Sequence, residues 1–470
     1  MQHEETATFV IIGGGIAGVS CIETIQYLHP NESIILLTES PLIKTVTNLV
    51  PLGKCITRFD IKETDSNALG ENVQVITDRM CTIVTKEKTI HTIQNRKIHY
   101  NYLCLCNGAR PKLIDQATKN PYIIGIRDTE SVLQFQSKIK DCTRITIVGN
   151  GGIASELVYE LRNVQLDWII KDQFISQTFV DPGAAEFFQS RIKTKATNER
   201  EMKSIIKRMR YSEDGMSESS KKGAALGPDW HRKLDLSGRA TELPESVQMH
   251  YNCEVQNIKQ NNLNSGHRLS VCLTNNETIE CDLLVSATGV IPCTDFDIDV
   301  PLAKGQDGGV LVDELMRTSV PGIFAAGDVC TAGWKTSDDW FQMRLWTQAR
   351  QMGTMVARGM VAALENEEIT QDFCFELFSH VTELFGYQVV LLGKYNGQGL
   401  DQNCEILIRS TPEKEYIKYV ISNGLVRGAI LIGETGLEET SENLILNQID
   451  VTPYGDDLLD PNIDIEDYFD

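Results

Sequence analysis

Three glycines near the start of the chain have the spacing of a phosphate-binding turn. Gly13, Gly15 and Gly18 follow an apolar run at residues 8–12 and precede an apolar-periodic segment at about residues 19–28. In this pattern the first glycine allows a tight turn, the second lets backbone approach a pyrophosphate, and the third lets helix pack on strand. The helix N-terminus then holds phosphate charge. The spacing therefore predicts a dinucleotide site.

A carboxylate at the end of the next strand would complete this site. The apolar run at residues 33–37 ends at Thr38 and Glu39, about twenty residues after Gly18, which is the separation expected for the motif. An acid at this place hydrogen-bonds the ribose hydroxyls of the nucleotide. We assign Glu39 to this role, and Thr38 is the alternative in the same register.

The same pattern recurs in the middle of the chain. Gly149, Gly151 and Ala154 follow a strand-like run at residues 144–148 and open a helix-like segment that ends near residue 162. Alanine is allowed at the third position, where the helix packs on the strand. Two such turns imply two dinucleotides.

The residues after the next strand bear on the choice of nicotinamide nucleotide. Lys171 and Asp172 directly follow the run at residues 165–170. An acid there favours NADH, and a base favours the 2′-phosphate of NADPH. Both types are present, so either nucleotide can serve. A solvated lysine at a strand end is the alternative interpretation of Lys171.

Asp328 ends a third segment that could contact a cofactor. It closes an Ala-Gly-Asp sequence after a strand-like run, and a helix is predicted from about residue 346 to residue 364. An aspartate there can hydrogen-bond a sugar-like hydroxyl, while the helix directs backbone N–H groups at an electron-rich ring edge. Taken alone, the tripeptide indicates only a turn.

The thirteen cysteines include no Cys-x-x-Cys or Cys-x-x-x-x-Cys pair. A relay from a cofactor to a disulfide needs two thiols in contact range, and Cys55 is the only cysteine near the distal segment of the first dinucleotide-binding unit. Cys104 and Cys106 are two apart on a predicted strand, so they share a face and are interpreted as core residues. We predict no catalytic side chain and no metal site.

Composition and length limit the remaining possibilities. A chain of 470 residues exceeds what one core supports, so two or three domains are expected. The net charge of −21 argues against general nucleic-acid or membrane-surface binding. No secretory pattern opens the sequence, and no apolar run reaches the ~18 residues that span a bilayer. We expect a cytoplasmic and nuclear protein, whose thiols stay reduced.

Two polar segments depart from the alternating strand and helix pattern. Residues 191–239 carry thirteen Lys or Arg against seven Asp or Glu, which predicts a basic, partly disordered insertion at about residues 195–244. The last fifteen residues, from Asp456, carry seven Asp or Glu and no Lys or Arg. We expect this acidic tail to be mobile in the isolated protein, with apolar anchors such as Ile463 and Phe469 able to dock in a partner's groove.

Together these motifs resemble the flavoproteins with two dinucleotide-binding domains, the pyridine nucleotide-disulfide oxidoreductase superfamily, over roughly residues 8–433. The resemblance implies that FAD contacts Gly13, Gly15, Gly18, Glu39, Gly108 and Asp328. It also implies that NADH or NADPH contacts Gly149, Gly151, Ala154, Glu156 and Gly289. Lys171 is assigned to the same nucleotide. Gly108 and Gly289 fall in the crossovers of the Ala-Thr-Gly type, although the first is written Cys-Asn-Gly here.

The departures from the family pattern concern the oxidising half of the reaction. The dithiol is missing, and so is the C-terminal His-Pro-Thr base of the glutathione-reductase-like members. His380 and Glu383 have the spacing of one helical turn and are interpreted as structural. Trp334, Trp340 and Trp346 follow Asp328 closely, where they can stack near the flavin, fill a partner-facing groove, or simply pack.

The resemblance implies an α/β architecture in which the NAD(P) domain is inserted in the FAD domain. We predict an FAD domain at residues 1–118 and 289–365, an NAD(P)H domain at residues 119–288, a smaller α+β domain at residues 366–452, and the acidic tail at residues 453–470. Hydride is expected to pass from nicotinamide C4 to flavin N5. Dioxygen, a quinone or a small disulfide could accept the electrons.

A narrower resemblance suggests a partner. The segments at residues 147–154, 225–231, 343–353 and 460–470 resemble one subgroup of the superfamily, which is associated with guarding the metal-dependent tRNA ligase complex against oxidation. This implies the tRNA ligase complex as a partner, reached through the acidic tail. The alternative to an enzyme is a redox-gated binding partner that turns over slowly.

Overall fold

The computed structural model describes residues 4–115, 120–195, 236–239, 247–262, 266–400 and 404–460. They form two compact units. The first contains the described residues up to 110 and from 290 onward, and the second contains those from 111 to 289. The predicted basic insertion lies almost wholly outside the described residues, and so does the acidic tail from residue 461.

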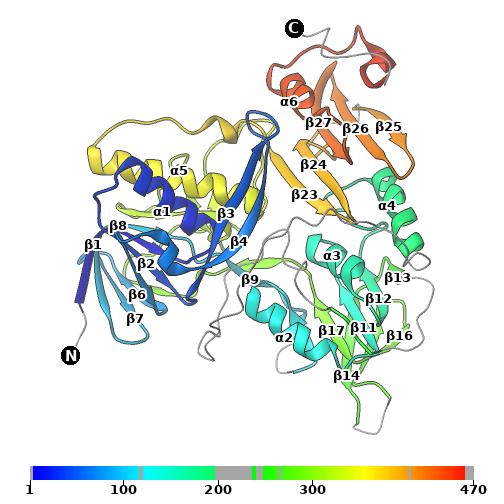
Figure 1. The fold of residues 1–470 in the computed structure, drawn as a ribbon, viewed down its shortest axis with the longest axis horizontal. Coiled ribbons are helices and arrows are strands. Elements are labelled where there is room, and N and C mark those ends of the chain that lie inside the picture. Colours follow the sequence, from blue (N-terminus) through cyan, green and yellow to red (C-terminus); the bar gives the residue numbers. More distant parts are fainter. Residues whose placement is uncertain are drawn as a thin grey trace. The chain divides into compact units, whose positions relative to one another are not determined.

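The first unit is built on a parallel sheet of Rossmann type (Figure 1). Its strands have the order β5-β2-β1-β8-β21. Their bounds are β1 Glu4–Ile12, β2 Ile34–Thr38, β5 Val73–Thr77, β8 Lys97–Leu105 and β21 Ile323–Ala325. Helix α1 (Ile16–Leu28) connects β1 to β2. The run Phe9–Ile12 is apolar without alternation because both faces of a parallel sheet are covered.

Shorter elements complete this unit. The sheet continues from β8 through β7 (Thr89–Thr92), β6 (Met80–Val84) and β19 (Asp297–Ile298). A hairpin of β3 (Leu42–Pro51) and β4 (Thr57–Asp65), the turn η1 (Ser66–Leu69), and the pair β20 (Val310–Val312) and β22 (Cys330–Ala332) surround it. The pair β9 (Ala109–Pro111) and β18 (Val290–Pro292) lies where the chain leaves the first unit and returns to it.

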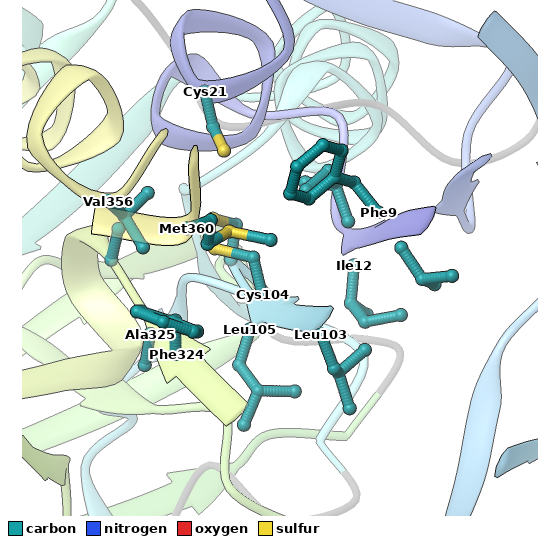
Figure 2. Close-up of a cluster of buried hydrophobic side chains, with 14 of the residues drawn as sticks. Phe9, Ile12, Cys21, Leu103, Cys104, Leu105, Phe324, Ala325, Val356 and Met360 are labelled. Carbon is teal, nitrogen blue, oxygen red and sulfur yellow. The ribbon is translucent and has the colours of Figure 1, made fainter. Parts of the chain in front are cut away.

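Helix α5 (Trp346–Glu365) packs on α1 over one core. Gly353 permits the close approach, because a Cβ atom there would lie 2.4 Å from the carbonyl oxygen of Ala17. Figure 2 shows side chains of this core, including Cys21 of α1, Cys104 of β8 and Met360 of α5. The predicted helix at residues 346–364 is thus present, one residue longer.

The second unit repeats the architecture of the first. Its described parallel strands have the order β13-β12-β11-β17-β10. The bounds are β10 Ile123–Gly125, β11 Arg144–Val148, β12 Gln165–Ile170, β13 Gln248–Tyr251 and β17 Leu283–Ser286. Its helices are α2 (Thr129–Ile139), α3 (Gly152–Glu160) and α4 (Pro182–Lys195), and an antiparallel sheet is formed by β14 (Val255–Gln260), β15 (Leu269–Leu273) and β16 (Thr278–Cys281).

The C-terminal residues form an antiparallel sheet of order β23-β24-β27-β26-β25. Its elements are η4 Phe373–Phe375, β23 Ser379–Leu384, β24 Tyr387–Gly393, β25 Glu405–Thr411, β26 Glu415–Ser422, β27 Leu425–Ile432, α6 Glu438–Leu446 and η5 Gly455–Leu459. This α+β element belongs to the same compact unit as the first glycine motif.

Two contacts explain why the C-terminal sheet joins the first unit. Cys55 and Ile56, in the loop between β3 and β4, pack into the core of this sheet. The fully buried carboxylate of Glu442 on α6 accepts hydrogen bonds from the backbone N–H groups of Lys54 (2.6 Å) and Cys55 (2.5 Å).

The start of the acidic tail differs from expectation. Leu458 and Leu459 of η5 are buried in the same core as Ile56, and Arg409 donates to the carbonyl oxygen of Leu459 (3.0 Å). The prediction of a mobile tail from Asp456 is therefore wrong for residues 456–459, because two leucines among the carboxylates anchor them. Within the described residues, no helix is long and apolar enough to cross a membrane.

Candidate nucleotide sites in the two units

The turn between β1 and α1 has the geometry that its glycines predict. Gly13 has a φ of +107°, and a Cβ atom there would lie 2.3 Å from the carbonyl oxygen of Cys106. A Cβ atom at Gly18 would lie 2.0 Å from the carbonyl oxygen of Gly13. A Cβ atom at Gly15 would meet nothing within 4 Å. Two glycines are thus required by close approach of backbone, and Gly15 faces open space where a ligand can approach.

Helix α1 begins directly at this open position. Gly15 is its N-cap residue, and no side chain caps the first N–H groups. Unpaired N–H groups at a helix start favour an anion. The turn can therefore receive a pyrophosphate.

A buried cation beside this turn was not predicted from the sequence. Lys44 of β3 is only 4% exposed, and its Nζ lies 2.6 Å from Glu63 Oε1 on β4. The backbone N–H of Lys44 donates to the carbonyl oxygen of Gly14 (3.0 Å). The ion pair is formed across the hairpin between residues nineteen apart, so no local motif reveals it.

The two candidates for the ribose contact separate in the structure. Thr38 is buried, and its Oγ1 accepts from the backbone N–H of Ser40 (3.3 Å). Glu39 is exposed, and its Oε1 lies 3.4 Å from Arg79 Nε. Of the pair, Glu39 is the one whose carboxylate can reach a ligand, and Arg79 is a neighbour that the sequence did not indicate.

Asp328 lies in the turn η3 (Gly327–Val329), immediately after β21. A Cβ atom at Gly327, whose φ is +76°, would lie 2.9 Å from Cβ of Ala17, so this turn lies against α1. Asp328 itself is buried. Helix α5 starts with Leu345 as its N-cap and no side-chain cap. The turn with Asp328 and a second open helix start therefore occur in the unit that holds the first glycine turn.

The remaining FAD candidate, Gly108, follows the carboxyl end of β8. Its φ is +67°, and a Cβ atom would meet nothing within 4 Å. Asn107, beside it, donates to the carbonyl oxygen of Cys293 (3.2 Å). A glycine is thus required here by backbone conformation, with open space in front of it.

The second glycine turn repeats these features. Gly149 has a φ of +131°, and a Cβ atom there would lie 2.1 Å from the carbonyl oxygen of Ala287. A Cβ atom at Gly151 would meet nothing within 4 Å, and Gly151 is the uncapped N-cap of α3. Ala154 is fully buried, as its packing role requires. Gly289 follows β17, with a φ of +105° and no atom near its Cβ position.

Asn150 ties this turn to the loop after β12. Its Nδ2 donates to Asp172 Oδ2 (2.8 Å) and to the carbonyl oxygen of Phe174 (2.9 Å). Its Oδ1 accepts from the backbone N–H of Ser176 (2.5 Å). The carboxylate of Asp172 is therefore oriented by the turn, whereas Lys171 is exposed. Glu156 lies half-buried on α3.

Each unit therefore fits one dinucleotide. Each has an open Cβ position at the middle glycine, an uncapped helix start and an acidic residue after the second strand. Comparison with known proteins agrees: the model of the pyridine nucleotide-disulphide oxidoreductase family matches residues 7–214 and 239–353, more than half of the chain. The chain belongs to this family.

Curated relatives extend the match to nearly the whole chain. Pyridine nucleotide-disulfide oxidoreductase domain-containing protein 1 of Drosophila melanogaster is 52% identical, over 98% of this chain and 99% of the relative. The protein of the same name from Homo sapiens is 46% identical, over 98% of each. A crystal structure of a ferredoxin reductase from Rhodopseudomonas palustris shares the fold, with a TM-score of 0.68, 20% identity, and 98% and 99% of the two chains covered.

Membership of the pyridine nucleotide-disulphide oxidoreductase family establishes the broad chemistry. The chain is an oxidoreductase whose cofactors are FAD and NADH or NADPH. The α/β fold class predicted from the sequence is confirmed.

The cysteines bear on the disulphide in the family's name. All thirteen are free. Burial raises the pKa of the Cys55 thiol to about 12, and the carboxylates of Glu442 and Asp372 act in the same direction. Cys104 and Cys106 are buried with their Sγ atoms 3.4 Å apart, on one face as the alternation predicts, and burial also raises the pKa of Cys104.

The C-terminal histidine and the tryptophans lie in packed surroundings. His380 is on β23, not on a helix, so it and Glu383 do not share a face as one-turn spacing suggests. Burial lowers the pKa of His380 to about 3, and its Nδ1 lies 3.0 Å from Thr347 Oγ1. Trp346 lies against His380, with ring centroids 4.9 Å apart. Trp334 and Trp340 pack together, 5.4 Å between centroids, with Phe375 against both.

Proposed function

We propose that this chain is an FAD-dependent NAD(P)H oxidoreductase that works without a redox-active dithiol. The observation that carries the proposal is the Cys55 thiol. It lies in the loop between β3 and β4, in the unit that holds the first glycine motif, it is buried, and its raised pKa keeps it protonated at neutral pH. A protonated thiol is a poor nucleophile, so it is unsuited to a relay.

The residues of the two units bind and orient the reactants in this proposal. The bound cofactors supply the hydride chemistry, from nicotinamide C4 to flavin N5. Gly15 and the start of α1 receive one pyrophosphate, and Gly151 and the start of α3 receive the other. Asp172, oriented by Asn150, would accept hydrogen bonds from the ribose hydroxyls, which supports NADH as a donor. Lys171 offers an exposed ammonium to NADPH.

Reduction and reoxidation of the purified protein test this function. The protein should be yellow, with about one FAD per chain. NADH added without oxygen should bleach the flavin, and a dithiol-specific reagent such as arsenite should not change the rate of reoxidation. A colourless protein after gentle purification, or inhibition by arsenite, would contradict the proposal.

A second function is a redox-gated binding partner with slow turnover. The cysteine spacing favours it, because no Cys-x-x-Cys or Cys-x-x-x-x-Cys pair offers the electrons an evident route out of the flavin. We propose, from the narrower resemblance, that the tRNA ligase complex is the partner, protected from oxidation by the reduced protein. Rapid reoxidation by a defined acceptor would support the enzyme, and a long-lived reduced complex would support the gate.

The acidic tail is proposed to dock on that partner in the cytoplasm and nucleus. Thirteen free thiols suit these reducing compartments. Because Leu458 and Leu459 are part of a core, the test is truncation after Asp460 rather than earlier. The shortened protein should keep FAD but capture less ligase complex with NADH present. Binding of the full chain should weaken with salt, because charge attraction is screened beyond ~10 Å at 0.1 M. Equal capture by both proteins would disprove tail docking.

A further inference from the structure

One side chain, Arg344, joins the turn that holds Asp328 to the start of α5. Its Nε donates to the carbonyl oxygen of Asp328 (2.8 Å), and its Nη2 donates to Asp307 Oδ2 (2.5 Å). The side chain is 19% exposed. Arg344 stands two residues before Trp346, where α5 begins. It therefore links the turn to a segment sixteen residues further along the chain.

Asp307 is itself fixed by the strands around it. Its Oδ1 accepts from the backbone N–H of Gly309 (3.1 Å) and from Thr331 Oγ1 (2.7 Å). Burial alone would raise the pKa of Asp307, but the hydrogen bonds from Arg344 and Thr331 outweigh burial and lower it. The carboxylate thus stays ionised and holds the guanidinium in one orientation.

The segment before α5 is held by two further side chains. Gln342 accepts from the backbone N–H of Ala332 (2.7 Å) and donates to the carbonyl oxygen of Cys330 (3.0 Å). Gln348, in the first turn of α5, accepts from the backbone N–H of Met343 (2.8 Å). Arg344 therefore projects from backbone that is tied to β22 on one side and to α5 on the other.

We propose that Arg344, oriented by Asp307, is a positioning residue for FAD that sets the separation between Asp328 and the N-terminus of α5. The proposal rests on the assignment of FAD to the first unit. A guanidinium suits this task because its rigid plane donates to a carbonyl and a carboxylate at the same time, whereas the single ammonium of lysine does not reach both. The carboxylate of Asp307 offsets the positive charge of the guanidinium.

Three variants test the proposal in the full-length protein. Arg344→Ala should weaken FAD binding roughly ten- to hundredfold, the range for losing hydrogen bonds of a charged group, and shift the absorption bands of the bound flavin. Arg344→Lys should restore part of the affinity. Asp307→Asn should retain FAD but raise its midpoint potential, because the guanidinium charge is no longer compensated.

The control is Arg358→Ala, which removes a more exposed arginine that lies within α5. Arg358 Nη1 lies 2.6 Å from Asp372 Oδ2, in an ion pair whose members are 37% and 38% exposed. This variant should leave the FAD dissociation constant, the spectrum and the potential unchanged.

Some results would overturn the proposal. Wild-type FAD affinity and spectrum in Arg344→Ala would do so. A merely structural role would lower the unfolding temperature of the apoprotein in Arg344→Ala and Arg344→Lys alike, with no change of potential in Asp307→Asn. If Arg344→Ala does not fold, the FAD affinity of Arg344→Lys and the midpoint potential of Asp307→Asn test the proposal instead. A wild-type protein without FAD would instead refute the cofactor assignment, a separate outcome.

Discussion

At Cys55, burial and charge act in the same direction. The thiol is 4% exposed, its Sγ lies 3.7 Å from the carbonyl oxygen of Phe373, and the carboxylate of Glu442 binds its backbone N–H. Each feature disfavours a negative sulfur. This residue is part of a buried core, and in our proposal it contributes packing rather than redox chemistry.

We predict that Cys55→Ser leaves the rate of flavin reduction by NADH unchanged, since no dithiol relay runs through this residue. Stopped-flow absorbance at the flavin band measures the rate. A thermal unfolding scan is the control, because the buried serine hydroxyl is expected to lower the stability of the fold without changing hydride transfer to the flavin. Loss of flavin reduction in a folded variant would show that the thiol takes part.

Lys171 and Asp172 are neighbours that favour different nucleotides, the lysine NADPH and the aspartate NADH. We predict that Lys171→Ala weakens NADPH binding roughly fivefold, equivalent to about 1 kcal/mol for an exposed ion pair, and leaves NADH binding nearly unchanged. Titration of each nucleotide against flavin reduction measures both constants. Lys140→Ala removes another exposed lysine of the same unit as a control. Equal effects on the two nucleotides would place Lys171 outside the ribose pocket.

At the scale of elements, charged side chains connect the neighbouring strands β11, β12 and β13. The buried carboxylate of Asp167 accepts from Arg144 Nε (2.6 Å) and lies 3.0 Å from His250 Nε2. His250 Nδ1 lies 3.1 Å from Glu277 Oε2. The hydrogen bond with Asp167 raises the pKa of His250. For Asp167, burial would raise the pKa, but the hydrogen bonds from His250 and Arg144 lower it.

These shifts predict how stability depends on pH. The folded pKa of His250 exceeds its unfolded value of 6.5, so its contribution is fully present below pH 6.5 and is lost as pH rises through the folded pKa. The free energy of unfolding should fall over that window. His250→Gln should flatten this dependence and lower stability below pH 6.5 by about 1.5–3 kcal/mol. Urea unfolding at several pH values measures it, and an unchanged slope in the variant would contradict the assignment.

The features that were predicted correctly are those determined by residues close together in the sequence. The strands at residues 144–148 and 165–170 were predicted with their observed bounds, because buried parallel strands are continuous apolar runs. The ion pair of Lys44 with Glu63 and the bridge from Arg344 to Asp307 were not predicted. Their partners meet only after a hairpin closes or a helix docks, and no spacing in the sequence encodes that. The anchoring leucines of η5 were hidden among carboxylates.

At the scale of the whole molecule, the two units share one plan. The order β5-β2-β1-β8-β21 in the first corresponds strand by strand to β13-β12-β11-β17-β10 in the second. Gly13 donates to the carbonyl oxygen of Leu37 (2.8 Å) as Gly149 donates to that of Ile169 (3.1 Å). Equivalent substitutions in the two turns should therefore affect different cofactors.

We predict that Gly15→Asp yields a colourless protein, whereas Gly151→Asp stays yellow but is no longer reduced by NADH or NADPH. Each carboxylate would oppose a pyrophosphate at an uncapped helix start. Neither position has a positive φ, and neither Cβ meets a neighbour, so both variants should fold. Each variant is the other's control. FAD content by absorbance and anaerobic reduction by NADH give the readouts, and loss of FAD from Gly151→Asp would contradict the assignment of the units.

The carboxylate of Glu442 also has a consequence for biosynthesis. The two peptide N–H groups that it binds, at Lys54 and Cys55, precede it by 388 and 387 residues. Translation therefore delivers this acceptor long after its two donors, so the loop between β3 and β4 stays without its carboxylate while the intervening residues are synthesised. Until the C-terminal sheet is made, Ile56 lacks the apolar partners that cover it in the folded protein, and exposed apolar surface favours aggregation. We expect that a chain ending just before α6 would keep both glycine turns but would leave the backbone of Lys54 and Cys55 without this carboxylate.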